Sequence, residues 1–177
     1  MGIDQKAFEF EATGQDGKTY KLSELSGQKV ILEWYNRDCP FVRKFYDAGE
    51  MQRLQKKHSE NAVWFKVVSS KPGSQGHMDA QKTIKNMKKE KAQVKAVLID
   101  EEGVIGRAFG ARTTPQMVII DEQGIVRYNG AIDSIPSTNS ADIEKARNYL
   151  NLAMNDLMAG NEVSIKRTRP YGCSVKY

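Results

Sequence analysis

The feature that most constrains the fold is a short run of apolar residues early in the chain. Residues 30–35 read Val-Ile-Leu-Glu-Trp-Tyr and contain a single carboxylate, that of Glu33. A short, nearly continuous apolar run predicts a strand buried on both faces, because a strand with one face in water alternates between apolar and polar residues. Such strands lie at the centre of sheets that are covered by helices on both sides.

Further strands and helices alternate after this run. The sequence predicts strands at 63–69, 97–100, 117–121 and 125–128, and helices at 40–58 (with a kink at Gly49), 79–91, 104–109 and 141–158. Alternation favours parallel pairing, and the tight turn at 122–124 adds an antiparallel pair. A hairpin from Phe8–Phe10 to Thr19–Leu22 would cover one edge. The predicted class is therefore α/β, with a mixed sheet flanked by helices.

Length and charge narrow the classes of function. A chain of 177 residues suits one domain of ordinary size. The net charge of +5 is mildly basic, but Lys82, Lys85 and Lys89 recur at helical spacing opposite Ile84 and Met87. This pattern is typical of a solvated helix face, and it lacks the interleaved aromatic residues that stack on bases. We therefore expect no nucleic-acid partner.

The small number of cysteines and histidines limits which metals and cofactors the chain could bind. Cys39 and Cys173 cannot form a framework of several disulfides, and with only His58 and His77 beside them no zinc-type spacing appears. The glycines are scattered rather than set as Gly-x-Gly-x-x-Gly after a strand. The sequence thus predicts no bound metal and no organic cofactor. It also predicts no membrane span, because no apolar run is long enough to cross a bilayer.

Cys39 lies where the buried strand is expected to end and a helix to begin. Pro40 suits the first turn of that helix. The unpaired amides and the dipole at a helix start favour the thiolate, which is the nucleophilic form, and Arg37, Arg43 and Lys44 could add positive charge. A buried, inert side chain is the commoner fate of a lone cysteine. The polar residue and the proline that flank Cys39 do not suit such a core position.

The segment from Val30 to Lys44 reads Val-Ile-Leu-Glu-Trp-Tyr-Asn-Arg-Asp-Cys-Pro-Phe-Val-Arg-Lys. It resembles the active-site segment of the thioredoxin superfamily, in which an aromatic-rich strand runs into Cys-x-x-Cys at a helix start. Glu33 then matches the buried acid of thioredoxins, and Gly-Ala-Arg-Thr-Thr-Pro at 110–115 matches the loop before their cis-proline. The resemblance implies a thioredoxin-like fold with Pro115 in the cis form.

Other segments resemble the redoxin branch of this superfamily, which includes alkyl hydroperoxide reductase and thiol-specific antioxidant proteins. They are the N-terminal hairpin and the segment 97–111, and the spacing between the Cys39 motif and the Pro115 motif leaves room for an extra strand and helix. The tail Tyr-Gly-Cys-Ser-Val-Lys-Tyr resembles a peroxiredoxin-like subgroup that ends in Gly-Cys-Ser, an apolar residue, Lys and an aromatic. We expect a thioredoxin-like redoxin domain over 1–160, with a βα insertion, and a C-terminal tail over 161–177 that carries Cys173.

At two places the sequence differs from the motifs of these families, and the differences limit the reactions that Cys39 could carry out. Val42 stands where disulfide reductases carry their second cysteine, so a local disulfide cannot form. Leu32 and Asn36 stand where peroxiredoxins have Pro and Thr or Ser, and the peroxiredoxin-like subgroup often has cysteine at the position of Asn36. Asn36 therefore favours disulfide exchange, although the family resemblance favours antioxidant function. Both substrates remain open.

Three further residues each have two interpretations. Cys173 could attack a sulfenic acid or mixed disulfide at Cys39, or it could be an uninvolved terminal thiol or one that pairs between chains. Glu33 could accept a proton beneath Cys39, or it could pair with a lysine. Pro115 could simply start a strand, or a cis bond could expose the backbone of Thr114 to an extended peptide substrate.

Taken together, the residues predict a thiol-dependent oxidoreductase that exchanges disulfides or reduces a peroxide, with electrons from an external thiol donor. The predicted catalytic residues are Cys39, Cys173, Glu33 and Arg37, and the predicted substrate-binding residues are Thr114, Pro115, Asn36 and Pro40. The alternative is a non-catalytic thioredoxin-like module that binds peptides or mixed disulfides. Similar redoxins are often exported to the periplasm, and the abrupt start of the chain fits removal of a signal peptide; a cytoplasmic location is the alternative.

Overall fold

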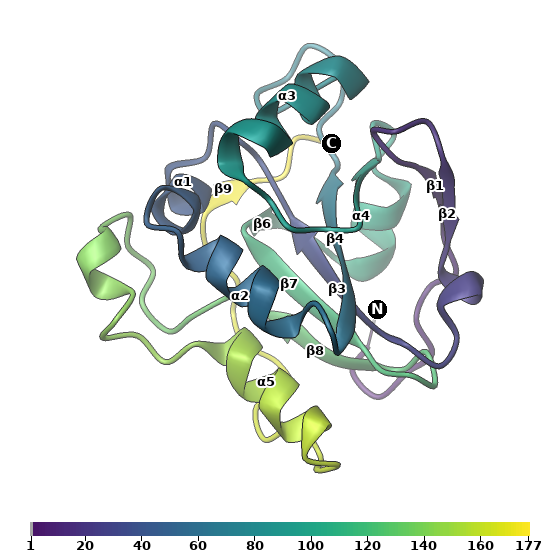
Figure 1. The fold of residues 1–177 in the computed structure, drawn as a ribbon, viewed down its shortest axis with the longest axis vertical. Helices are drawn as coiled ribbons and strands as arrows, with labels where there is room; N and C mark the ends of the chain where they lie inside the picture. Colours follow the sequence, from purple (N-terminus) through teal and green to yellow (C-terminus); the bar gives the residue numbers. More distant parts are fainter. Residues whose placement is uncertain (1) are drawn as a thin grey trace.

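The computed structural model describes residues 2–177 and is built around a mixed sheet (Figure 1). The sheet has five strands in the order β5-β4-β3-β7-β8. These strands are β3 (Lys29–Trp34), β4 (Ala62–Val68), β5 (Ala96–Ile99), β7 (Gln116–Ile120) and β8 (Val126–Gly130). β3, β4 and β5 are parallel, whereas β7 runs antiparallel to both β3 and β8. The predicted mixed sheet is confirmed, with the strand that precedes Cys39 at its centre.

Helices cover both faces of the sheet, which explains the nearly continuous apolar run of β3. Ile31 faces a core shared with α1, α2 and α5, whereas Leu32 and Trp34 face a second core shared with α4 and the N-terminal hairpin. All three side chains are fully buried. The helices are α1 (Pro40–Asp47), α2 (Glu50–His58), α3 (Ala80–Glu90), α4 (Val104–Phe109) and α5 (Tyr149–Met158). None of the helices within residues 2–177 combines the length and the hydropathy needed to span a bilayer.

The N-terminal hairpin covers the edge strand β5, as predicted. Its strands are β1 (Glu11–Thr13) and β2 (Thr19–Lys21), followed by the 3-10 turn η1 (Leu22–Leu25). The amide of Gln15 at the hairpin turn donates to the carbonyl of Val97 on β5, over 3.1 Å. Residues 8–10, which were expected to form the first strand, instead precede β1.

The first long helix of the prediction is two helices. Gly49 stands between α1 and α2 with a φ of 76°, a left-handed conformation that no helix interior adopts. The chain therefore turns at Gly49 and begins α2 afresh at Glu50. The predicted kink at Gly49 is therefore at the correct residue, but the structure has a complete break between two helices there.

The helix predicted over 141–158 is wrong in its first half. Only the 3-10 turn η2 (Ser140–Asp142) and α5 are helical there. The side chain of Asn148 accepts a hydrogen bond from the amide of Asn151 and so caps α5, and the amide of Tyr149 donates to the carbonyl of Ile132. A local cap and a tertiary hydrogen bond therefore override the helical spacing of the residues before Asn148.

The C-terminal tail docks on the sheet side that carries Cys39. Its short strand β9 (Cys173–Ser174) pairs antiparallel with β6 (Thr113–Thr114), which directly precedes Pro115. Figure 1 shows β9 beside α1. Cys39 is the residue that precedes the first residue of α1. The tail thus brings the second cysteine to the first.

Candidate active site

Cys39 lies at the junction of β3 and α1, as predicted from sequence. It is the N-cap residue of α1, with Pro40 as the first helical residue. Asn36 shapes the turn before it, because its carbonyl accepts from the amide of Cys39 over 3.1 Å and its side-chain oxygen accepts from the amide of Asp38 over 2.9 Å. Asn36 is itself buried. This turn fixes the direction in which the Cys39 side chain leaves the backbone.

The loop before Pro115 lies directly beside Cys39. The peptide bond between Thr114 and Pro115 is cis, as the resemblance implied, and Pro115 also stands just before β7. The Cys39 thiol donates a hydrogen bond to the Thr114 carbonyl, with 3.2 Å between Sγ and the oxygen. Two motifs that are 75 residues apart in sequence therefore meet in one place.

Cys173 joins this pair from the tail. It stands opposite Thr114 in the β6–β9 register, and both cysteines are free thiols. Burial, followed by the hydrogen bond and the electrostatic interaction with Cys39, raises the pKa of Cys173 to about 12. The two cysteines therefore contact each other within one chain, a question that sequence left open.

The contact affects the protonation of Cys173. A hydrogen bond that raises the pKa of Cys173 is one in which Cys173 keeps its proton and donates it towards Cys39. The nucleophilic role of Cys39 and the resolving role of Cys173 stay predictions at this point. Lys176 acts in the opposite direction and favours the Cys173 thiolate.

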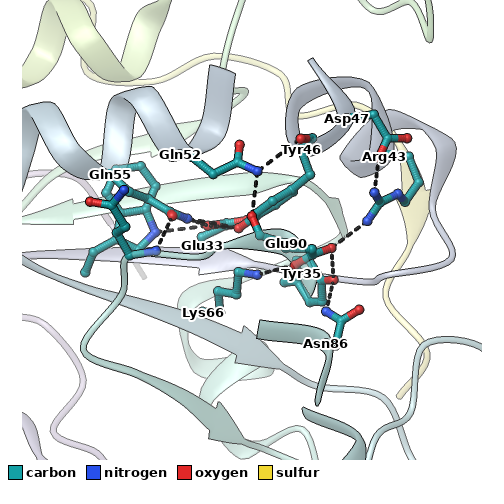
Figure 2. A network of polar contacts seen from close by, with 12 residues as sticks. Glu33, Tyr35, Arg43, Tyr46, Asp47, Gln52, Gln55, Lys66, Asn86 and Glu90 are labelled. Atoms are coloured by element: carbon teal, nitrogen blue, oxygen red, sulfur yellow. Dashed lines mark hydrogen bonds and ion pairs between the residues drawn. The ribbon is translucent and has the colours of Figure 1, made fainter. Parts of the chain in front are cut away.

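Glu33 lies in a buried polar network on the same side of the sheet (Figure 2). It accepts hydrogen bonds from the Tyr46 hydroxyl at 2.8 and 3.0 Å, from Trp64 Nε1 at 3.0 Å and from Gln55 Nε2 at 3.4 Å. Burial raises the pKa of Glu33, while the neighbouring Lys66 lowers it. Lys66 therefore acts on Glu33 through its charge, while its direct ion pair is with Glu90, and proton transfer between Glu33 and Cys39 stays a prediction.

A second carboxylate extends the network to the helix that Cys39 begins. Glu90 on α3 lies 2.8 Å from Lys66 Nζ, accepts from the Tyr35 hydroxyl at 2.7 Å and pairs with Arg43 on α1 at 2.5 Å. Burial lowers the pKa of Lys66, because it disfavours the charged ammonium. Figure 2 shows these side chains converging between the sheet, α1 and α3.

Lys66 and Glu90 were missed by sequence reasoning, although a signal for Lys66 existed. Residues 62–68 read Ala-Val-Trp-Phe-Lys-Val-Val, so Lys66 is a single charge inside an apolar strand, just as Glu33 is. In the parallel register of β3 and β4, Glu33 stands opposite Lys66. Two opposite charges isolated in two adjacent buried strands indicate a pair.

The positive charges expected around Cys39 are engaged by carboxylates. Arg37 is exposed and lies 3.3 Å from Asp38, and Arg43 belongs to the network just described. Lys44 is buried and lies 3.5 Å from Asp133. A direct effect of Arg37 on Cys39 stays a prediction.

Replacing Glu33 by glutamine is expected to stabilise the fold, and to do so only above acidic pH. The pKa of folded Glu33 is raised above its ordinary value of 4.5, so its contribution to stability is fully present below pH 4.5 and is lost as the pH rises through the folded pKa. Glutamine removes that loss. We expect a gain of about 1–3 kcal/mol at neutral pH, the usual cost of a buried polar group whose partners compensate it incompletely.

Urea unfolding of the Glu33→Gln variant and the unmodified chain at pH 4 and pH 7.5 measures this difference. The exposed Glu102→Gln variant serves as the control and should follow the unmodified chain at both pH values. An equal effect of Glu33→Gln at both pH values would show that folding does not raise the pKa of Glu33.

Comparison with protein families and curated proteins gives related sequences. The model of the AhpC/TSA family matches residues 3–129. The thiol:disulfide interchange protein DsbE of Escherichia coli K12 is 28% identical over 145 residues, which cover 81% of this chain and 72% of DsbE. DsbE of Yersinia pestis is 27% identical over 134 residues, covering 75% of this chain and 65% of that protein.

Solved structures share the fold. A hypothetical protein from Sinorhizobium meliloti has a TM-score of 0.82 at 17% identity, covering 100% of this chain and 95% of its own. An uncharacterised protein from Geobacillus kaustophilus has a TM-score of 0.82 at 21% identity, covering 99% and 92%. The exposed lipoprotein thioredoxin Etrx1 of Streptococcus pneumoniae has a TM-score of 0.55 at 25% identity, covering 76% and 95%. The first two matches extend through the C-terminal tail.

Proposed function

The chain belongs to the AhpC/TSA family, and from this premise we propose that it is a thiol–disulfide oxidoreductase in which Cys39 attacks a disulfide and Cys173 resolves the product. The observation that carries the proposal is the contact of the two thiols beside the cis-proline loop. The relatives named thiol:disulfide interchange protein support exchange as the reaction. An external thiol supplies the electrons.

The first step forms a mixed disulfide. The Cys39 thiolate attacks one sulfur of the substrate disulfide, a bond forms between the two sulfur atoms, and the substrate's other sulfur leaves as a thiolate. In the mixed disulfide, the Cys39 sulfur is uncharged and is bonded to the substrate sulfur, so it no longer stabilises the protonated form of Cys173. Two of the causes that raise the pKa of Cys173 are thereby removed, while Lys176 still favours its thiolate.

The second step releases the substrate. The Cys173 thiolate attacks the Cys39 sulfur, the mixed disulfide breaks, and the remaining substrate sulfur leaves as a thiolate. The substrate disulfide has then gained two electrons, and the chain holds a Cys39–Cys173 disulfide. An external dithiol reduces this bond and returns both cysteines to thiols.

A comparison of oxidants tests this function against peroxide reduction. The reduced chain is mixed with glutathione disulfide or with hydrogen peroxide at equal concentrations and quenched with acid, small thiols are removed, and the thiols that remain on the protein are counted. We expect faster thiol loss with the disulfide, because Asn36 is committed to the turn before Cys39 through its hydrogen bond to Asp38. Rapid loss with peroxide and none with the disulfide would contradict the proposal.

We also propose that the protein works outside the cytoplasm. The pneumococcal relative is described as an exposed lipoprotein, and a secreted disulfide oxidoreductase of Mycobacterium tuberculosis has the same fold with a TM-score of 0.54 at 17% identity. Disulfides persist in exported compartments, where a protein of this activity finds substrates. Cell fractionation followed by detection of the chain tests the location, and recovery only from the cytoplasm would contradict it.

A further inference from the structure

The last seven residues occupy the place where a peptide substrate is expected to bind. Besides the β6–β9 pairing, the Val175 amide donates to the Arg112 carbonyl over 3.0 Å, and the Lys71 amide donates to the Lys176 carbonyl over 2.9 Å. The tail therefore lies as an added strand along the cis-proline loop (Figure 1). Strand addition of this kind is how extended peptides bind to exposed backbone edges.

With the tail in place, Cys39 is closed to other molecules. Its exposed fraction is 0%, and Cys173 packs against the same core and contacts its thiol. Disulfide exchange requires the attacking thiolate to reach a substrate sulfur directly. An external disulfide can therefore react with Cys39 only after β9 has left the edge.

The surface along the cis-proline loop that the tail covers, here called the groove, makes specific contacts with the two residues before Cys173. The Tyr171 ring packs edge-on against Phe41, with 5.8 Å between ring centroids, and its hydroxyl donates to Asp133. Gly172 passes so close to the loop that a Cβ atom there would lie 1.9 Å from the Thr114 carbonyl oxygen, and its φ is +123°. This position therefore admits only glycine.

The groove also binds an aromatic side chain at the end of the tail, that of Tyr177. The Tyr177 hydroxyl donates to the Ala111 carbonyl over 2.7 Å, and the Arg107 guanidinium lies over the Tyr177 ring at 4.6 Å. Gly103 and Gly106 make room for this side chain, since a Cβ atom at either would come within 2.5 Å of it. The tail is thus held at both ends of its strand.

We propose that residues 171–177 are a tethered substrate strand, and that the groove they fill binds extended peptides in which an aromatic residue and a glycine directly precede the reacting cysteine. Such a peptide, with its cysteine already in a disulfide, displaces the tail; the Cys39 thiolate attacks that cysteine, the other sulfur of the substrate disulfide leaves as a thiolate, and the peptide leaves in turn as a thiolate when the tail brings Cys173 back to attack Cys39. The chemistry of this cycle rests on the function proposed above, whereas binding in the groove does not.

Binding is measured on full-length chains that carry Cys39→Ser and Cys173→Ser, so that no disulfide forms. The probe is a fluorescent heptapeptide, Tyr-Gly-Ser-Ser-Val-Lys-Tyr, which repeats the tail with serine in place of cysteine. In this background Gly172→Ala forces the tail out of the groove by its clash with Thr114. The matched control is Gly160→Ala, whose φ of +74° imposes a similar backbone strain with no atom within 4 Å of the new Cβ.

By fluorescence anisotropy, Gly172→Ala is expected to bind the probe at least tenfold more tightly than Gly160→Ala. Tyr177→Ala removes one anchor of the tail, should also bind more tightly than the control, and decides the matter if Gly172→Ala does not fold. A probe with alanine in place of glycine should not bind. Equal binding by all the variants, or equal binding of the alanine probe, would overturn the proposal and would leave the exchange reaction of the unmodified cysteines untouched.

Discussion

Replacing Cys39 by serine is expected to abolish disulfide reduction, whereas replacing Cys173 by serine is expected to stop the same reaction after its first step. Loss of the nucleophile should lower the rate by roughly 10³-fold or more, because the covalent route disappears. Without Cys173, Cys39 still forms the mixed disulfide but nothing attacks it within the chain. Acid quenching and intact-mass measurement after addition of glutathione disulfide distinguish the two variants.

The expected masses are distinct for each variant. Cys39→Ser should stay unmodified, and Cys173→Ser should carry one glutathione on Cys39 that persists until a thiol is added. Loss of glutathione from Cys39 of the Cys173→Ser variant before any thiol is added would contradict the resolving role of Cys173. Full turnover by Cys39→Ser would contradict the assignment of the nucleophile.

Replacing Lys66 by methionine is expected to destabilise the fold by about 3–5 kcal/mol, the usual cost of breaking a buried ion pair by removing one partner. Lys66 is fully buried between Glu33 and Glu90, and its ammonium also lies 4.0 Å from the centroid of the Tyr35 ring. Its loss leaves Glu33 without its neighbouring cation, and leaves Glu90 with Arg43 as its remaining ion-pair partner. Urea unfolding at pH 7.5 measures the change.

The control for this variant is Lys85→Met on the exposed face of α3, which should change stability by less than about 0.5 kcal/mol. Glu33→Gln combined with Lys66→Met should recover part of the loss, because it removes one of the two unpaired carboxylates. If Lys66→Met is as stable as Lys85→Met, the buried network does not hold a charged lysine.

The central part of the site could be predicted from sequence because its signals are local. An apolar run followed by polar residues and proline fixed the strand end, the helix start and the position of Cys39 at their junction. The cis bond before Pro115 followed from a motif that resembles the thioredoxin loop. These elements need no knowledge of distant contacts.

The rest depends on contacts between distant residues. The strand at Cys173 is two residues long and forms by pairing with Thr113 and Thr114. A strand this short leaves no alternation of apolar and polar residues in the tail from which it could be predicted. The pairing of Lys66 on β4 with Glu90 joins two elements that are separate in sequence, since Glu90 is the last residue of α3. The false helix over 141–148 had helical spacing, but the cap at Asn148 and the hydrogen bond to Ile132 prevailed.

The most direct test of the account is whether Cys39 and Cys173 form a disulfide within one chain during turnover. The reduced protein is treated with one equivalent of glutathione disulfide, quenched with acid, digested and examined by mass spectrometry. The account predicts a monomer that is two hydrogen atoms lighter, with the peptides around Cys39 and Cys173 linked and glutathione present only transiently. A lasting glutathione adduct on Cys39 beside a free Cys173 thiol, or a disulfide-linked dimer, would contradict it.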